Sequence, residues 1–218
     1  MNAILHGSLT LLFCYLLGSI LFGLIISECA YGVDIRQFGS GNVGFTNIKR
    51  TLGWKPAIAV LLLDGAKGAI AIWISRKVFA GEAVHARDTL ILVGGVLAII
   101  GHNWSIFFKF AGGKGVATSL GVLIALDWRV AGLAVLVGFP LLLYPGYMSL
   151  AATVGAATLP VWFWLLGDPL PWRIFGVVLL IFVLVRHRAN YARIRSGSEP
   201  RFSFRGSPDP PAAPQVQT

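Results

Sequence analysis

The chain contains few charged residues, and acidic residues are the scarcest. Only 12% of its 218 residues are charged, with 9 Asp and Glu against 18 Lys and Arg, whereas 56% are hydrophobic and the mean hydropathy is +0.75. A soluble domain carries about 25% charged residues, so this composition excludes the ordinary soluble class. We therefore expect a membrane protein.

Cysteine is equally rare. Cys14 and Cys29 are the only two in the sequence. On a largely helical stretch they would lie about 22 Å apart at ~1.5 Å per residue, which is too far for a disulfide. We infer no redox role, and we expect neither a metal site nor a cofactor.

Nucleotide-binding motifs are also missing. Gly39, Gly41 and Gly44 fit G-x-G-x-x-G, but a membrane span precedes them where a Rossmann fold has a strand. Around Lys114, Phe108 occupies the position of the first P-loop glycine and Gly115 replaces the required Ser or Thr. We infer no nucleotide site and expect no nucleic-acid partner.

Long apolar runs are abundant. A bilayer core of ~30 Å needs ~20 apolar residues per helix. The seven candidate runs are Ile4 to Ile26, Pro56 to Ser75, Thr89 to Phe110, Gly115 to Leu126, Val130 to Tyr144, Ser149 to Leu166 and Trp172 to Val185. The fourth and fifth are short and could instead form a re-entrant pair, which leaves five spans as the alternative. The predicted fold class is an all-α integral membrane protein with about seven transmembrane helices.

The cations predict an orientation. With seven spans, 12 Lys and Arg fall in loops 27–55, 109–114 and 145–148 and in the tail from Arg186, against 5 in the opposite segments. The positive-inside rule then places the N-terminus outside and the C-terminus in the cytoplasm. The alternative for many of these cations is that they only set topology and contact anionic lipid.

The chain divides into two parts. Residues 1–195 form the predicted helical membrane domain, and residues 196–218, which are rich in Pro, Ser and Gly, form a predicted disordered cytoplasmic tail. Three segments of the membrane domain could carry chemistry: 34–50, 101–118 and 186–194.

The first segment has the composition of an anion site. Its glycines at 39, 41 and 44 allow left-handed turns that expose backbone N–H groups. Polar side chains around them could donate to a phosphate, and these are Ser40, Asn42, Thr46, Asn47 and Arg50. Turn formation alone is the alternative explanation for this composition.

The second segment places Gly112, Gly113 and Gly115 around Lys114 at the start of a helix. Free N–H groups and the positive end of the helix dipole both favour a phosphate there. A lysine that snorkels beside a flexible hairpin is the alternative. His102 is equally compatible with packing and with ligand binding.

The third segment continues from the last span. His187, Asn190 and Arg193 are three residues apart and share a helix face, which suits a small phosphorylated polyol. Within the second span, Asp64 and Lys67 have the same spacing, and we expect them to pair and to play a structural role.

Together these segments resemble the bacterial acyl-phosphate:glycerol-3-phosphate acyltransferase family over about residues 5–202. The resemblance is carried by G-S-G-N-V-G-F-T-N at 39–47, by the Gly-His to Gly-Gly-Lys-Gly-Val-Ala-Thr block at 101–118, and by Arg186-His187-Arg188 with Asn190. It implies catalytic roles for Ser40, Arg50, Lys114, His187 and Asn190, and an acceptor-facing role for Ser149. The chain departs from the family pattern at Ser105, Gly146 and Ala189, which bears on how the acceptor is held.

The resemblance further implies an enzyme of the bacterial inner membrane with its site on the cytoplasmic face. The expected reaction transfers a fatty acyl group from acyl phosphate to the 1-hydroxyl of glycerol 3-phosphate, which gives lysophosphatidate and phosphate. We expect membrane lipid as the surroundings and a monomer as the active form. A transporter of phosphate or an organophosphate is the alternative, although we find no internal repeat. A lipid-binding scaffold would leave the ordered set of donors unexplained.

Overall fold

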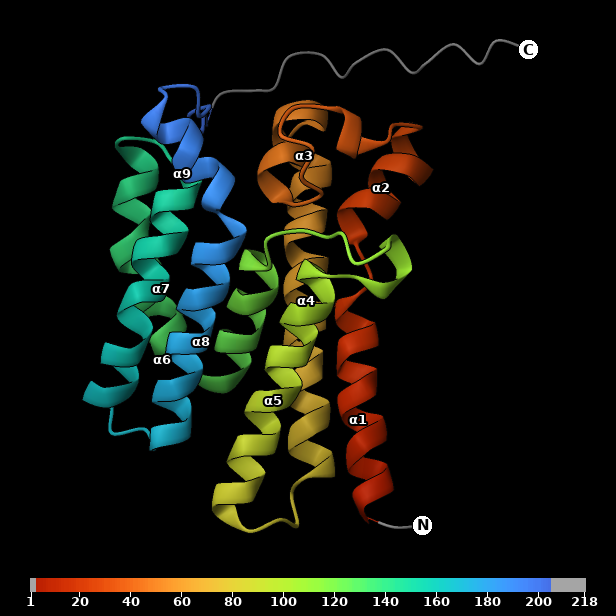
Figure 1. Cartoon of the computed structure of the whole chain (residues 1–218), viewed down its shortest axis with the longest axis vertical. Helices are drawn as coiled ribbons and strands as arrows, with labels where there is room; N and C mark the ends of the chain where they lie inside the picture. The colour runs from red at the N-terminus through yellow and green to blue at the C-terminus, as the bar shows by residue number, and fades with distance from the viewer. Residues whose placement is uncertain (1–2, 205–218) are drawn as a thin grey trace.

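The computed structural model describes residues 3–204, and this part of the chain is helical. Nine α-helices follow one another: α1 (Ala3–Gly18), α2 (Phe22–Tyr31), α3 (Phe45–Leu52), α4 (Trp54–Val78), α5 (Val84–Asn103), α6 (Val116–Leu143), α7 (Met148–Leu165), α8 (Leu170–Arg186) and α9 (Arg188–Arg195). Two 3₁₀ turns, Ile35–Gln37 and Ile106–Phe108, lie in the loops. The long helices stand side by side, with α3 and α9 at one end of the bundle and the start of α1 at the other (Figure 1). The all-α prediction is confirmed for these residues.

Several helices suit a bilayer. Helices α4, α5, α6 and α7 are each long and apolar enough to cross a membrane, and the number rises to six if the bent pairs α1–α2 and α8–α9 each count as one span. Many large apolar side chains are exposed on the outside of the bundle, among them Leu62, Trp73, Leu136 and Trp164. This surface fits a lipid environment better than water.

Helix α6 is interrupted at Asp127, whose φ of −149° and ψ of 104° are extended. The first segment, 116–126, runs along the second half of α4, with Gly121 so close to Gly65 that a side chain at 121 would meet the Gly65 carbonyl. The second segment packs against α7, where Gly138 is equally close to Ala151. The fourth and fifth predicted runs therefore exist as separate helical segments, as the turn between them indicated.

The helical structure is interrupted between α1 and α2 at residues 19–21, and the backbone carbonyls there accept hydrogen bonds from side chains. Ser105 Oγ donates to the Ser19 carbonyl at 2.6 Å, and Lys67 Nζ donates to the Ile20 carbonyl at 2.5 Å. The break therefore connects α1 to the second glycine segment and to α4. Cys14 and Cys29 are both free, which agrees with the prediction of no disulfide.

The predicted disordered tail does not begin at Ser196. Phe202 stacks against Phe45 with ring centroids 6.2 Å apart and lies edge-on to Trp54 at 6.1 Å. Its backbone N–H donates to the Gly146 carbonyl at 2.7 Å. The prediction treated residues 196–218 as one low-complexity stretch, but its first part contains aromatic and acidic side chains that can pack and pair. Residues 205–218 lie outside the described part.

Candidate functional site

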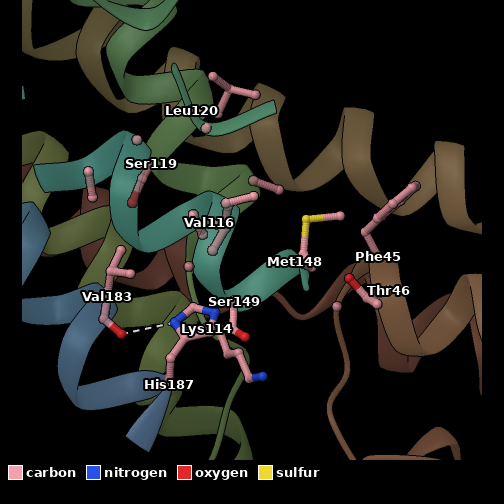
Figure 2. A pocket seen from close by; sticks show the side chains of 18 of the residues that line it. Phe45, Thr46, Lys114, Val116, Ser119, Leu120, Met148, Ser149, Val183 and His187 are labelled. Atoms are coloured by element: carbon pink, nitrogen blue, oxygen red, sulfur yellow. Dashed lines mark hydrogen bonds between the residues drawn. The ribbon is translucent and has the colours of Figure 1, made fainter. Parts of the chain in front are cut away.

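One pocket brings the three predicted segments together. It has a cavity volume of about 430 Å³ and is lined by all five residues predicted to be catalytic: Ser40, Arg50, Lys114, His187 and Asn190. The predicted binding residues on its wall are Asn42, Gly44, Thr46, Asn47, His102, Gly115, Ser149 and Arg193. Lys114, Ser149 and His187 lie close together on one side, with Phe45 and Thr46 across from them (Figure 2). Gly39, Gly41, Gly112 and Gly113, which were also predicted to bind substrate, are not among the residues that line the cavity.

The first glycine segment is organised by Asn47, which is 1% exposed. Its Oδ1 accepts from the Ser40 N–H at 2.9 Å, and its Nδ2 donates to the carbonyls of Phe38 at 2.9 Å and Ile35 at 3.3 Å. Gly39 has a φ of +58°, which favours glycine. The side-chain amide of Asn47 is thus hydrogen-bonded to the backbone of the loop. These contacts do not match the expectation that it donates to a ligand.

The backbone of the second glycine segment is held by residues of other helices. Arg186 at the end of α8 donates through Nε to the Gly113 carbonyl at 3.0 Å and through Nη2 to the Gly112 carbonyl at 2.9 Å. The Gly113 N–H donates to the His102 carbonyl at 3.0 Å. Gly115, with a φ of +74°, immediately precedes α6. The free N–H groups of the first turn of α6 therefore lie next to Lys114.

A chain of hydrogen bonds links Lys114 to the tail. Lys114 Nζ donates to Asn190 Oδ1 at 2.5 Å, Asn190 Nδ2 donates to Glu199 Oε1 at 2.6 Å, and Arg193 Nε donates to Glu199 Oε2 at 2.7 Å. Glu199 was not predicted as a site residue, because it lies in the segment interpreted as a disordered tail. The structure makes it the carboxylate that orders the third segment.

The electrostatics of the pocket favour anions. Arg50, Lys114 and Arg193 line it together with two carboxylates, Glu199 and Asp64, and Asp64 is paired with Lys67. Burial, with the charges of Arg193, Arg186 and Arg50, lowers the pKa of Lys114 to about 8, although Glu199 opposes the shift. A bound phosphate would raise the pKa of Lys114 again, because an opposite charge nearby stabilises the charged form.

His187 is neutral and has a defined tautomer. Its Nδ1 lies 2.9 Å from the Val183 carbonyl (Figure 2). Since a carbonyl only accepts, Nδ1 carries the proton and Nε2 keeps its lone pair. Burial and the charge of Lys114 lower the pKa of His187 to about 4. The ring can accept a hydrogen bond from a hydroxyl, but with this pKa it is a weak base.

The pocket has a second, apolar arm. Small and aliphatic side chains of α6, α7 and α8 line it, including Ala134, Gly138, Ala151, Gly155, Leu159 and Leu179. Ser149 is 1% exposed and its Oγ is without a hydrogen-bond partner in the described part of the chain. This buried hydroxyl is therefore available to a ligand in the pocket. A polar end joined to an apolar arm suits a phosphate-bearing amphiphile.

The departures from the family pattern have local explanations. Ser105 gains the bond to the Ser19 carbonyl, Gly146 has a φ of +88° and accepts from Phe202, and Ala189 is exposed. A basic residue at 146 would be strained by that backbone conformation.

Among residues 3–204, no group of three or more His, Cys, Asp and Glu could hold a metal ion.

Comparison with known proteins agrees with these features. The family model described as glycerol-3-phosphate acyltransferase matches residues 8–197. A glycerol-3-phosphate acyltransferase of Gloeobacter violaceus is 41% identical over 86% of this chain and 90% of its own length, and one of Thermus thermophilus is 40% identical over 90% and 95%.

Solved structures are similar as well. The glycerol 3-phosphate form of PlsY (YgiH), an integral membrane glycerol 3-phosphate acyltransferase, superposes with a TM-score of 0.83 at 37% identity, covering 90% of this chain and 96% of that one. Its lysophosphatidic acid form gives a TM-score of 0.81 at 36% identity, covering 90% and 95%. On this evidence the chain belongs to the glycerol-3-phosphate acyltransferase family.

Proposed function

We propose that this protein transfers a fatty acyl group from acyl phosphate to the 1-hydroxyl of glycerol 3-phosphate. The observation that carries the proposal is the single cavity in which a cationic, glycine-lined end continues into an apolar arm. One end fits the phosphate groups of both substrates and the other fits an acyl chain. The names of the similar proteins support the same reaction.

The charge and polarity of the pocket walls indicate where each substrate binds. The two phosphates occupy the polar end, where Lys114, Arg50 and the N–H groups at the start of α6 provide positive charge and donors. The acyl chain lies in the arm between α6 and α7. Ser149, at the junction of the two, supplies a hydroxyl to the acceptor.

The reaction needs no covalent enzyme intermediate, because acyl phosphate is already an activated mixed anhydride. The acceptor hydroxyl oxygen bonds to the acyl carbon, the bond from that carbon to the phosphate oxygen breaks, and phosphate leaves with the electron pair. The hydroxyl proton passes to a phosphate, with His187 Nε2 as a hydrogen-bond partner of the hydroxyl. Lys114 and Arg50 stabilise the developing charge, which is commonly the largest catalytic contribution.

The membrane arrangement completes the proposal. Seven spans with the N-terminus outside would place the pocket on the cytoplasmic face of a bacterial inner membrane, and a monomer contains every residue of the site. The distribution of Lys and Arg supports this orientation. Thiol labelling tests it, since Cys29 is exposed near the first glycine segment: an impermeant reagent should spare it in intact cells and label it in inverted vesicles.

The decisive experiment uses the purified protein in lipid nanodiscs with acyl phosphate and glycerol 3-phosphate. We expect equal amounts of phosphate and lysophosphatidate, both dependent on the acceptor. Lys114→Ala and Arg50→Ala should each lose on the order of 10²–10³ in rate while still inserting. Uptake of glycerol 3-phosphate into proteoliposomes without product formation would favour the transporter instead.

A further inference from the structure

Three ionisable side chains are buried together at the edge of the pocket, and the reaction described above uses none of them. Asp64 and Lys67 on α4 are each 1% exposed, and His102 on α5 is 3% exposed. Lys67 Nζ lies 2.9 Å from Asp64 Oδ1 and 2.9 Å from His102 Nδ1. Ionisable groups among membrane helices are costly, and they usually have a functional reason.

The pairing fixes the protonation of the histidine. Asp64 stabilises Lys67 as an ammonium, and an ammonium has three donors and no acceptor. The short contact therefore requires His102 Nδ1 to accept, so the ring proton lies on Nε2. His102 Nδ1 is also 3.6 Å from Asp64 Oδ1, too far for a hydrogen bond that would favour the other tautomer.

The opposite edge of the ring faces the second glycine segment. An added side-chain carbon at Gly113 would come within 2.1 Å of His102 Nε2. The same residue accepts from the Gly113 N–H through its backbone carbonyl at 3.0 Å, and it lines the pocket. Within residues 3–204, no protein acceptor is bonded to Nε2. Its N–H is therefore available at the floor of the cationic end.

A simple ion pair does not account for this arrangement. Asp64 and Lys67 would neutralise each other without His102, yet the lysine also contacts the imidazole and the Ile20 carbonyl at the α1–α2 break. These contacts join α4 and α5 to the segment between α1 and α2. They define an orientation for the ring as well as a charge balance.

We propose that Asp64 and Lys67 are positioning residues that hold His102 in the Nε2–H tautomer, so that this N–H donates to a substrate phosphate at the cationic end of the pocket. The proposal rests on the proposed function, which supplies the phosphate. It extends that function by a donor on the cavity floor and by two residues that act only through it.

The test reads the tautomer directly. Protein with ¹⁵N-labelled histidine in nanodiscs is examined by NMR, and His102→Gln and His187→Asn assign the two signals. We expect His102 protonated at Nε2 and His187 protonated at Nδ1, so each ring serves as the reference for the other. Wild-type His102 protonated at Nδ1 would overturn the proposal.

The variant is chosen to avoid an unpaired buried charge. Lys67→Met alone would strand Asp64, whereas Asp64→Leu with Lys67→Met removes both charges at similar volume. We expect His102 in the double variant to shift toward Nδ1–H, and kcat/KM to fall about 10–100-fold, as is typical when the partner that orients a functional imidazole is lost. An unchanged His102 tautomer would contradict the proposal.

A second pair of variants separates positioning from folding. His102→Gln keeps an amide N–H near the Nε2 position, whereas His102→Asn does not reach it. We expect His102→Gln to retain at least tenfold more activity than His102→Asn at equal yield and equal thermal stability; equal activities would contradict the donor role. Because the NMR readout needs no turnover, a wild-type protein without acyl transfer would defeat the proposed function and leave the tautomer result to be judged separately.

Discussion

The two glycine segments reach a similar shape by different means. The first, at 39–47, is held by its own Asn47, which bonds to backbone groups nearby in sequence. The second, at 112–115, is held by Arg186, more than 70 residues away, and by His102 below it. A loop held by its own residues forms wherever its sequence is present. A loop held by residues of two other helices forms only when those helices are packed.

This difference predicts that the two segments differ in their sensitivity to mutation. The second segment contains Lys114 and is held by residues of α5 and α8. Its geometry therefore depends on how the helices of the bundle pack. The first segment has Ser40 exposed at its tip. We therefore expect damage to the second segment to be larger and to spread further than comparable damage to the first.

Among variants that disturb the support of a glycine segment, the largest effect should follow Gly113→Ala. The new methyl group would lie 2.1 Å from His102 Nε2, so either the loop or the buried ring must move. A displacement of this size at a catalytic loop typically costs about 10²-fold in rate. Turnover in nanodiscs measures it, with Gly132→Ala as control, since nothing lies within 4 Å of a side-chain carbon there. Equal activity of the two variants would show that the second segment tolerates movement.

Arg186→Met should rank next. It removes the bonds to the carbonyls of Gly112 and Gly113 and the stacking of the guanidinium over Trp104. We expect about a 10–100-fold loss in kcat/KM, by analogy with other residues that orient a functional group. Arg188→Met is the matched control, because this neighbouring arginine is exposed and its replacement removes the same charge. Similar losses in both variants would mean that charge, and not the loop contact, is what matters.

The sequence predicted local features well and distant ones poorly. The helical class and the break near Asp127 follow from apolar runs and turn residues, and the residues that line the pocket were predicted from the three segments together with the family resemblance. Arg186 was recognised as part of the third segment, but its two carbonyl partners depend on how α8 packs, which spacing does not contain. The same applies to Asp64 and Lys67, whose pairing was predicted but whose contact with His102 was not.

Glu199 illustrates a different failure. Composition averaged over residues 196–218 is dominated by the Pro-rich end, so the acidic and aromatic residues near its start were assigned to a disordered tail. In the structure Glu199 bonds to Asn190 and Arg193. A window ending near residue 204 would have shown a carboxylate among arginines, followed by two phenylalanines.

A smaller, pH-dependent effect should distinguish the cation of the second segment from that of the first. Lys114 has a pKa of about 8, so its charge is present below that pH and is lost above it. We expect kcat/KM to fall as pH rises through about 8, approaching tenfold per unit. With its pKa near 4, His187 should produce no further step between pH 6 and 8. In Lys114→Arg the residual activity should lack this decline, since an arginine stays charged; a decline that persists would assign it to another group.

The smallest effect should come from the segment that covers the first loop. Phe202 packs on Phe45 and Trp54 and reaches the pocket wall, yet it bonds to no residue predicted to contact the reacting atoms. Phe202→Ala should therefore lower activity only a few-fold, because Glu199 remains anchored by Arg193 and Asn190. Phe204→Ala is the comparison, since Phe204 is 52% exposed. If Phe202→Ala were as damaging as Arg186→Met, the first segment would also depend on distant support, and the contrast between the two loops would fail.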